Sequence, residues 1–256
     1  MKAKDSFISS ITGLVIGFFS GLVGVGGGEY RAPVLVYLLK RRAKFAIAAN
    51  LFIGLLVVSV SFLKRKGYLL PLNMLLISFV FIIFSIAGSY IGAILTKKRK
   101  DGFLIKLLGL LLIIVSFKVF LDSDKVYSFN LEISLLSLIL AIIFGFLIGI
   151  LSGFLGIAGG EFRVPVLLLI FGMPIKIAGT ANLLVSIPTV LTGFLKHNSL
   201  GHVDKDSIAI AFIMGVFSII GAFIGSSLIF LVHDKLLFIV LSIIMFLAGL
   251  KMLVRP

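Results

Sequence analysis

Long uncharged runs alternate with short polar segments along the whole chain. A helix needs about 20 mostly apolar residues to cross the hydrocarbon layer of a bilayer. The pattern therefore predicts an all-α, polytopic membrane protein. The long runs are Phe7–Gly28, Phe45–Leu63, Leu69–Thr96, Phe103–Phe117, Ile133–Gly160, Ile177–Leu195, Ser207–Val232 and Leu236–Leu250. In the first run, Gly13, Gly17 and Gly21 have the spacing typical of close helix packing.

Two further apolar runs, Ala32–Leu39 and Val164–Phe171, are too short to span, and each follows a glycine cluster. They indicate glycine-broken or re-entrant helices. Irregular backbone of this kind is tolerated at membrane depth only where protein buries it or where it lines a wet cavity. Counting with and without these segments gives about 8 to 10 crossings.

The chain contains an internal repeat at an offset of 132 residues. Gly27–Leu35 returns as Gly159–Leu167, and Ala49–Leu51 returns as Ala181–Leu183, with matches at Gly, Glu, Arg, Pro and Asn rather than only at Leu and Ile. We therefore divide the chain into a first membrane repeat (1–121), a linker (122–132) and a second membrane repeat (133–256).

The relative orientation of the repeats depends on the short segments. If each broken pair counts as two crossings, each repeat has an odd number and the halves are inverted, an arrangement common in secondary transporters. If the short segments do not cross, the halves are parallel. We expect inversion. The basic clusters Lys40–Lys44 and Lys97–Lys100 are placed on the cytoplasmic side of the membrane, and Lys64–Lys66 falls on the other side.

Composition removes most other classes of protein. With 60% hydrophobic and 13% charged residues, the chain has too few charges to cover a soluble globule. It has no cysteine and three histidines, so we expect no metal, no cofactor and no enzymatic activity, and we expect the histidines to be solvated. The net charge of +14 indicates topology and contact with anionic lipid, not nucleic-acid binding.

The most informative charges are two Glu-x-Arg pairs, Glu29 with Arg31 and Glu161 with Arg163. Ionisable groups at membrane depth are costly and by default mark a site or a pathway. One interpretation is a structural clamp, in which each Glu neutralises its own Arg. The other is that the two arginines hold an anion between the halves, because the planar guanidinium fork suits oxyanions. Both can hold together.

The neighbouring residues fit an anion site. Glycines allow the backbone to approach a ligand closely; they are Gly26, Gly27, Gly28, Gly159 and Gly160. Pro33 and Pro165 stand where a first helical turn would begin, so helix N-termini from Ala32 and Val164 onward would present free N–H groups to an anion. Asn50 and Asn182 form a second matched pair, which either lines a polar path or joins helices.

Gly24–Leu35 and its repeat Gly156–Leu167 resemble the duplicated signature of the sulfite exporter TauE/SafE family, over essentially the whole chain. The resemblance implies a multi-pass carrier in the cytoplasmic membrane for sulfur-containing anions such as sulfite or sulfonates. The chain departs from the commonest pattern by placing Glu and Arg between the glycines and the proline in both halves. These extra arginines fit an anion.

We therefore expect a transporter of a small anion that works by alternating access of two repeats. Arg31 and Arg163 would bind the substrate, and Glu29 and Glu161 would orient the arginines or carry a proton. A passive anion channel and a membrane-embedded assembly or enzymatic component are the alternatives.

Overall fold

The structure, a computed structural model, describes residues 3–65, 70–96, 102–125, 133–203 and 208–254. Every regular element within these ranges is helical. The first half contains α1 (Ala3–Val23), α2 (Gly28–Pro33), the π-helical turn η1 (Val34–Leu38), α3 (Ala43–Lys64), α4 (Leu72–Leu95) and α5 (Gly102–Leu121). The second half contains α6 (Leu135–Leu155), α7 (Gly160–Leu169), α8 (Ile175–Ser199), α9 (Ile208–Leu228) and α10 (Asp234–Val254).

Seven helices of the described part, α1, α3, α4, α6, α8, α9 and α10, are long and apolar enough to cross a membrane. The expectation of an all-α polytopic membrane protein is thus confirmed. The two elements that follow the glycine clusters, α2 and α7, are only 6 and 10 residues long.

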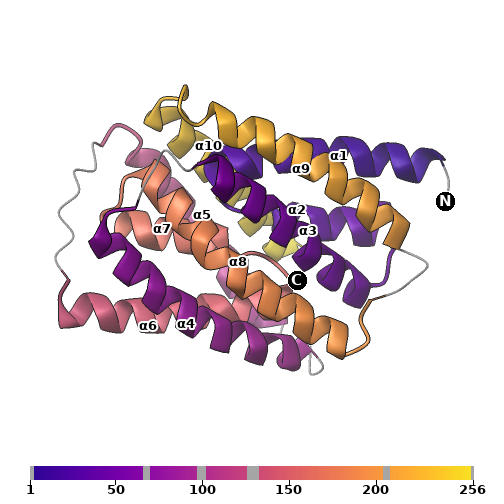
Figure 1. The fold of residues 1–256 in the computed structure, drawn as a ribbon, viewed down its shortest axis with the longest axis horizontal. Helices are drawn as coiled ribbons and strands as arrows, with labels where there is room; N and C mark the ends of the chain where they lie inside the picture. The colour runs from indigo at the N-terminus through magenta and orange to yellow at the C-terminus, as the bar shows by residue number, and fades with distance from the viewer. Residues whose placement is uncertain (1–2, 66–69, 97–101, 126–132, 204–207, 255–256) are drawn as a thin grey trace.

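Equivalent elements of the two halves begin at the spacing of the sequence repeat: α1 and α6 at residues 3 and 135, α2 and α7 at 28 and 160, and α3 and α8 at 43 and 175. In Figure 1, α1 begins at the right-hand end beside the N-terminus, whereas α6 begins at the left-hand end.

The two halves interleave rather than pack as separate bodies. α1 packs along α9, α6 packs along α4, and α5 packs along α10 (Figure 1), so the most extensive helix pairs each join one half to the other. Glycines make these contacts close: a Cβ at Gly13 would lie 2.6 Å from the carbonyl oxygen of Met214, and one at Gly149 would lie 2.5 Å from that of Ser85. Small residues are the usual means of close helix packing in membranes, and the packing role expected for the glycines of α1 is confirmed.

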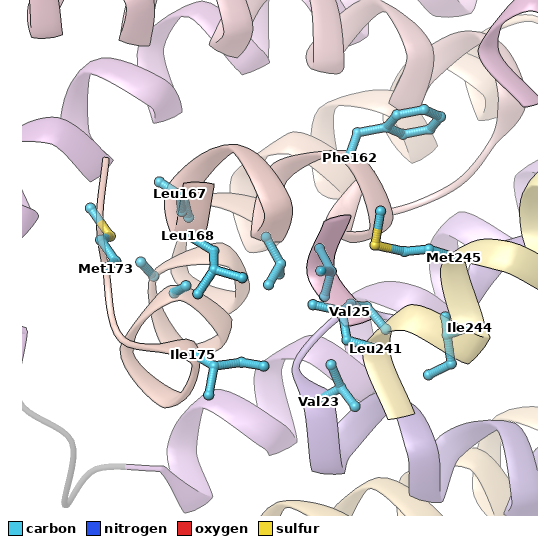
Figure 2. Packing of buried hydrophobic residues seen from close by; sticks show 14 of the residues in the cluster. Val23, Val25, Phe162, Leu167, Leu168, Met173, Ile175, Leu241, Ile244 and Met245 are labelled. Atoms are coloured by element: carbon cyan, nitrogen blue, oxygen red, sulfur yellow. The ribbon is translucent and has the colours of Figure 1, made fainter. Parts of the chain in front are cut away.

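The main apolar core also draws on both halves. Val23 and Val25, at the end of α1 and just after it, belong to the same buried cluster as Leu167 of α7 and Leu241 of α10 (Figure 2). The segment that links α1 to α2 is therefore held at the centre of the bundle, which is what irregular backbone at membrane depth requires.

The two ends of α10 lie beside different helix starts. At its first residue, Asp234 forms an ion pair of 3.2 Å with Lys176, in the first turn of α8. At its last turn, Lys251 lines a cavity together with Ala43 and Ala46, in the first turn of α3. The starts of the equivalent helices α3 and α8 therefore lie at opposite ends of α10.

Candidate functional site

The two broken segments are built around left-handed glycines. Gly27 (φ 68°) and Gly159 (φ 75°) are the N-cap residues of α2 and α7, a backbone conformation that favours glycine. The helices therefore begin at Gly28 and Gly160, and not at Ala32 and Val164 as the prolines suggest. The expectation that proline occupies the first turn is wrong: Pro33 and Pro165 are each the sixth residue of their helix.

The glycine segments of the two halves touch each other. A Cβ at Gly26 would lie 2.5 Å from the Cβ of Ala158, its counterpart in the repeat. Similarly, a Cβ at Gly160 would lie 2.6 Å from the Cα of Val25, and one at Gly28 would lie 3.1 Å from the Cα of Ile157. In this structure the glycines thus allow one loop to approach the other.

Arg31 is fully buried and holds the first loop in place. Its Nε donates to Oδ1 of Asn50 at 3.0 Å, and its Nη2 donates to the carbonyl oxygen of Gly26. Its remaining nitrogen, Nη1, is buried and has no hydrogen-bond partner among the described residues.

Arg163 is equally buried and makes the equivalent contacts in the second half. Its Nη1 donates to Oδ1 of Asn182 at 2.8 Å and to Oγ of Ser186 at 2.9 Å, with a longer contact of 3.5 Å to the carbonyl oxygen of Ala158. Its Nε and Nη2 are buried without a hydrogen-bond partner in the part of the chain that the structure describes. Each guanidinium is therefore partly engaged by its own loop and retains donor capacity.

The two asparagines connect the halves. Nδ2 of Asn50 donates to the carbonyl oxygen of Gly28 at 2.9 Å and also to that of Gly156, in the opposite half. Nδ2 of Asn182 donates across in the other direction, to the carbonyl oxygen of Gly24 at 2.6 Å. Each asparagine thus joins its own arginine to the loop of the other repeat.

The glutamates are not hydrogen-bonded to the arginines of their motifs. Both carboxylate oxygens of Glu29 and of Glu161 are buried and accept no hydrogen bond from the described residues. The two carboxyl groups do lie close enough to interact with each other as a side-chain pair. The arrangement places two carboxyls and two partly satisfied guanidiniums at the junction of the halves.

Lys251 is a polar residue of this region that lies outside the candidate site residues predicted from the sequence. Proline has no N–H, so Pro33 leaves the carbonyl oxygen of Glu29 without its helical donor. Nζ of Lys251 donates to that oxygen at 2.7 Å. With one inserted residue in the second half, the repeat also aligns Lys251 with Lys118, and this alignment is the only sequence signal for it.

Two side chains that the sequence predicts to be exposed, those of Arg65 and His197, are buried. The sequence patterns predict an exposed loop charge at Arg65 and a solvated side chain at His197, but both are fully buried. Arg65 donates to the carbonyl oxygens of Gly21 (2.7 Å) and Leu22 (2.8 Å), at the end of α1.

His197 occupies the position equivalent to Arg65 in the second half. Its Nε2 lies 2.9 Å from the carbonyl oxygen of Gly153, near the end of α6, and its Nδ1 lies 2.7 Å from Nδ1 of His202, which is also buried. Both side chains therefore engage the C-terminal carbonyls of a long helix, which otherwise lack partners. Among the described residues no group of three or more His, Cys, Asp or Glu side chains is placed to hold a metal ion.

Membrane-length helices that surround a pair of broken helices, with buried ionisable residues where the two halves meet, are the architecture of a multi-pass membrane transporter.

The chain belongs to the family described as Sulfite exporter TauE/SafE, whose sequence pattern matches residues 2–119 and 140–256. It is 24% identical to the probable membrane transporter protein YunE of Bacillus subtilis (strain 168), over 95% of each chain. It is 28% identical to the probable membrane transporter protein MJ0441 of Methanocaldococcus jannaschii, over 95% of this chain and 93% of the relative. No solved structure matches the chain. The resemblance noted from the repeated motif is confirmed, and the protein is a membrane transporter of this family.

Proposed function

We propose that this transporter carries a small anion, a sulfur-containing oxyanion or a sulfonate, across the cytoplasmic membrane by alternating access of its two repeats. Arg31 and Arg163 bind the anion, and no covalent chemistry takes place. The observation that carries the proposal is the pair of buried guanidiniums, one from each half, that retain N–H groups without an acceptor among the described residues. A buried, unsatisfied charged donor is costly, and an oxyanion offers the acceptors that it lacks.

Inversion of the repeats is supported by the contacts at the two ends of α10. A helix of 21 residues is about 31 Å long, close to the thickness of the hydrocarbon layer. If α10 crosses the membrane, the starts of α3 and α8 lie on opposite faces. Equivalent elements then point in opposite directions, as alternating access by inverted repeats requires.

A carrier is favoured over a passive channel by how tightly the centre is closed. Gly26 packs on Ala158, and Asn50 and Asn182 bridge the two loops by hydrogen bonds. The passage of an anion past these contacts needs the loops to separate, which is a conformational step that an open pore does not have.

Proton coupling is assigned to Glu29 and Glu161. Two buried carboxyls within interaction range of each other repel when both are ionised, and a shared proton removes that repulsion. Movement of this proton would make the protonation of the two glutamates depend on the charge of the bound anion.

The anion site is tested by thermal unfolding of the purified full chain with sulfite, thiosulfate, sulfate, an organic sulfonate and acetate. A ligand at one hundred times its Kd stabilises the folded state by about 2.7 kcal/mol. Arg31→Lys and Arg163→Lys keep the charge but lose the planar fork. A tenfold loss of affinity in either variant would reduce that stabilisation to about 1.4 kcal/mol.

Arg65→Lys is the control for the loss of a buried guanidinium, because Arg65 is an equally buried arginine that donates to the carbonyl oxygens of Gly21 and Leu22 at the end of α1 and not to either asparagine. It should lower the unfolding temperature and leave the ligand-induced shift intact. Wild-type ligand shifts in a folded Arg31→Lys, Arg163→Lys double variant would refute the binding role. Counterflow in proteoliposomes separates a carrier, which shows it, from a channel, which does not.

A further inference from the structure

The arginines of the two motifs use different edges of their guanidinium groups, although their partners are equivalent. In a planar guanidinium, Nε and Nη2 form one edge, whose two N–H bonds run nearly parallel and match two oxygens of an oxyanion. Arg31 uses this edge within its own half: Nε donates to Oδ1 of Asn50 at 3.0 Å, and Nη2 donates to the carbonyl oxygen of Gly26. The nitrogen of Arg31 that has no partner among the described residues, Nη1, lies outside this edge.

Arg163 reaches the two equivalent acceptors with a single nitrogen. Its Nη1 donates to Oδ1 of Asn182 at 2.8 Å and makes the 3.5 Å contact to the carbonyl oxygen of Ala158, the counterpart of Gly26 in the repeat. Its Nε and Nη2 are both buried without a hydrogen-bond partner in the described ranges. The edge that Arg31 uses for its own loop is therefore free in Arg163.

A serine of α8 accounts for this difference. Oγ of Ser186 accepts a hydrogen bond of 2.9 Å from Nη1 of Arg163 and lies 3.3 Å from Oδ1 of Asn182, so it draws that nitrogen towards the asparagine. At the repeat offset of 132 residues, the equivalent position in α3 is Gly54, which has no side chain to offer as an acceptor. A Cβ at Gly54 would lie 3.6 Å from Nη2 of Arg31, an ordinary contact, so this position also lies beside its arginine.

The free edge of Arg163 is bordered by a glycine and by a carboxyl that does not occupy it. A Cβ at Gly159, where φ is 75°, would lie 3.7 Å from Nη2, so a larger residue would place its side chain next to this edge. Glu161 interacts electrostatically with Arg163, but its carboxylate oxygens accept no hydrogen bond from the described residues. A buried pair of donors without an acceptor is costly, and an oxyanion supplies two acceptors at once.

We propose that Ser186 is a positioning residue that makes the two arginines unequal: it holds Arg163 by Nη1 and leaves the Nε–Nη2 edge to bind the anion in a bidentate manner. Arg31, whose edge is occupied by its own loop, adds donors from Nη1 only. The inference rests on the proposed function, because it takes the same small oxyanion as ligand. The second half is then the principal anion-binding half, and the residue types at positions 54 and 186 decide this.

The test measures the anion affinity of the purified full chain by calorimetric titration, with sulfite, thiosulfate, sulfate and an organic sulfonate as probes. Ser186→Ala lets the free edge of Arg163 turn onto its own loop, as that of Arg31 does, and affinity should fall about tenfold, as expected for the loss of one charge-assisted hydrogen bond. Adding Gly54→Ser to this variant gives the first half the missing acceptor and should restore affinity towards the wild-type value. In the wild-type background, Arg163→Lys should lower affinity more than Arg31→Lys.

A double-variant cycle separates positioning from a general structural role. Because Ser186 acts through the edge of Arg163, Ser186→Ala should cause no further loss of affinity in the Arg163→Lys background, whose ammonium has no such edge. A merely structural serine would lower affinity by the same factor in both backgrounds. Ser226→Ala is the matched control and should leave affinity unchanged, because Ser226 is a buried serine of α9 that donates to the carbonyl oxygens of Ala222 and Phe223 in its own helix.

The outcomes distinguish this inference from the proposed function. Wild-type affinity in Ser186→Ala, or equal factors in the two backgrounds of the cycle, overturns the positioning role and leaves the arginine site standing. If Ser186→Ala does not fold, Gly54→Ser in the wild-type chain decides the matter: it should raise affinity and make Arg31→Lys as costly as Arg163→Lys, and an unchanged affinity overturns the inference. Absence of anion binding in the wild type defeats the proposed function and the inference together.

Discussion

A carboxylate that is buried without a hydrogen-bond donor is among the most costly groups a folded chain can contain. Glu29 and Glu161 are two such groups, one from each repeat, and their carboxyl groups lie within interaction range of each other. A cost of this kind is retained where it has a use. Here the use we assign is to take up and release a proton as the site changes state.

Glu29→Gln and Glu161→Gln test this role, because glutamine has nearly the same shape and cannot ionise. The double variant should still bind the anion, and its unfolding temperature without anion should be lower, since the buried Arg31 and Arg163 lose the nearby carboxyls that offset their charge. Its transport should no longer respond to an imposed pH gradient, measured by uptake into proteoliposomes with and without that gradient. Asp234→Asn, at an exposed carboxyl, is the control; undiminished pH-driven uptake in the double variant would contradict the assignment.

At the residue scale, the repeat identifies the paired residues correctly as a group. Glu29, Arg31, Asn50 and their counterparts all lie around the two loops. The sequence prediction for Arg65 is wrong because its neighbours Lys64 and Lys66 make it look like part of a loop cluster. Which way a side chain at a helix end turns depends on acceptors from other segments, here the carbonyls of Gly21 and Leu22, and local sequence carries little trace of them.

At the element scale, the sequence predicts that the two broken helices start at Ala32 and Val164. Their observed starts, Gly28 and Gly160, lie four residues earlier. Proline is a strong helix-start signal, but a left-handed glycine at the N-cap is sufficient to begin the helix earlier. The proline then falls inside the helix and frees a carbonyl, which in α2 is met by Lys251. The sequence pattern locates the break correctly but assigns the helix start to the proline, whereas the left-handed glycine begins the helix.

The close pairing of α4 with α6 leads to a stability prediction. A Cβ at Gly153 would overlap the carbonyl oxygen of Ser89, a backbone atom that cannot move without the whole helix. Gly153→Ala should therefore lower the free energy of unfolding by about 1–3 kcal/mol, as overpacking does. The readout is the thermal loss of helical circular dichroism in detergent.

Gly215→Ala is the matched control for this substitution. It is the same change in another long helix, where the added Cβ would lie 3.6 Å from Cγ1 of Ile53, an ordinary contact. Because alanine has a higher helix propensity than glycine, this variant should be neutral or more stable by up to about 1 kcal/mol. Equal effects at the two positions would mean that the α4–α6 contact is looser than the structure has it.

At the scale of the whole molecule, inversion of the repeats predicts that equivalent helices start on opposite membrane faces. The chain has no cysteine, so single cysteines can be introduced without a background. Lys44→Cys reports the start of α3, and Lys235→Cys, next to the Asp234 that pairs with Lys176, reports the start of α8. A membrane-impermeant maleimide applied to intact cells should label the Lys235→Cys variant and leave the Lys44→Cys variant unlabelled until the membrane is opened. Labelling of both variants from one face would instead indicate parallel repeats.

The sequence by itself determined the class of the protein, its helical segments and the residues worth testing. Apolar runs of membrane length have no other stable outcome than helices in a bilayer, and Gly, Glu, Arg, Pro and Asn repeated in register identify one motif used twice. Only the tertiary structure decided what those residues touch. Three kinds of contact join residues that are far apart in the chain. Helix α1 packs on α9 and α4 packs on α6. Asn50 and Asn182 each donate to the loop of the other repeat, and Lys251 donates to the carbonyl that Pro33 leaves free. Such contacts are selected by packing and by the need to satisfy every buried polar group, and these constraints act on the folded molecule rather than on any local stretch of sequence.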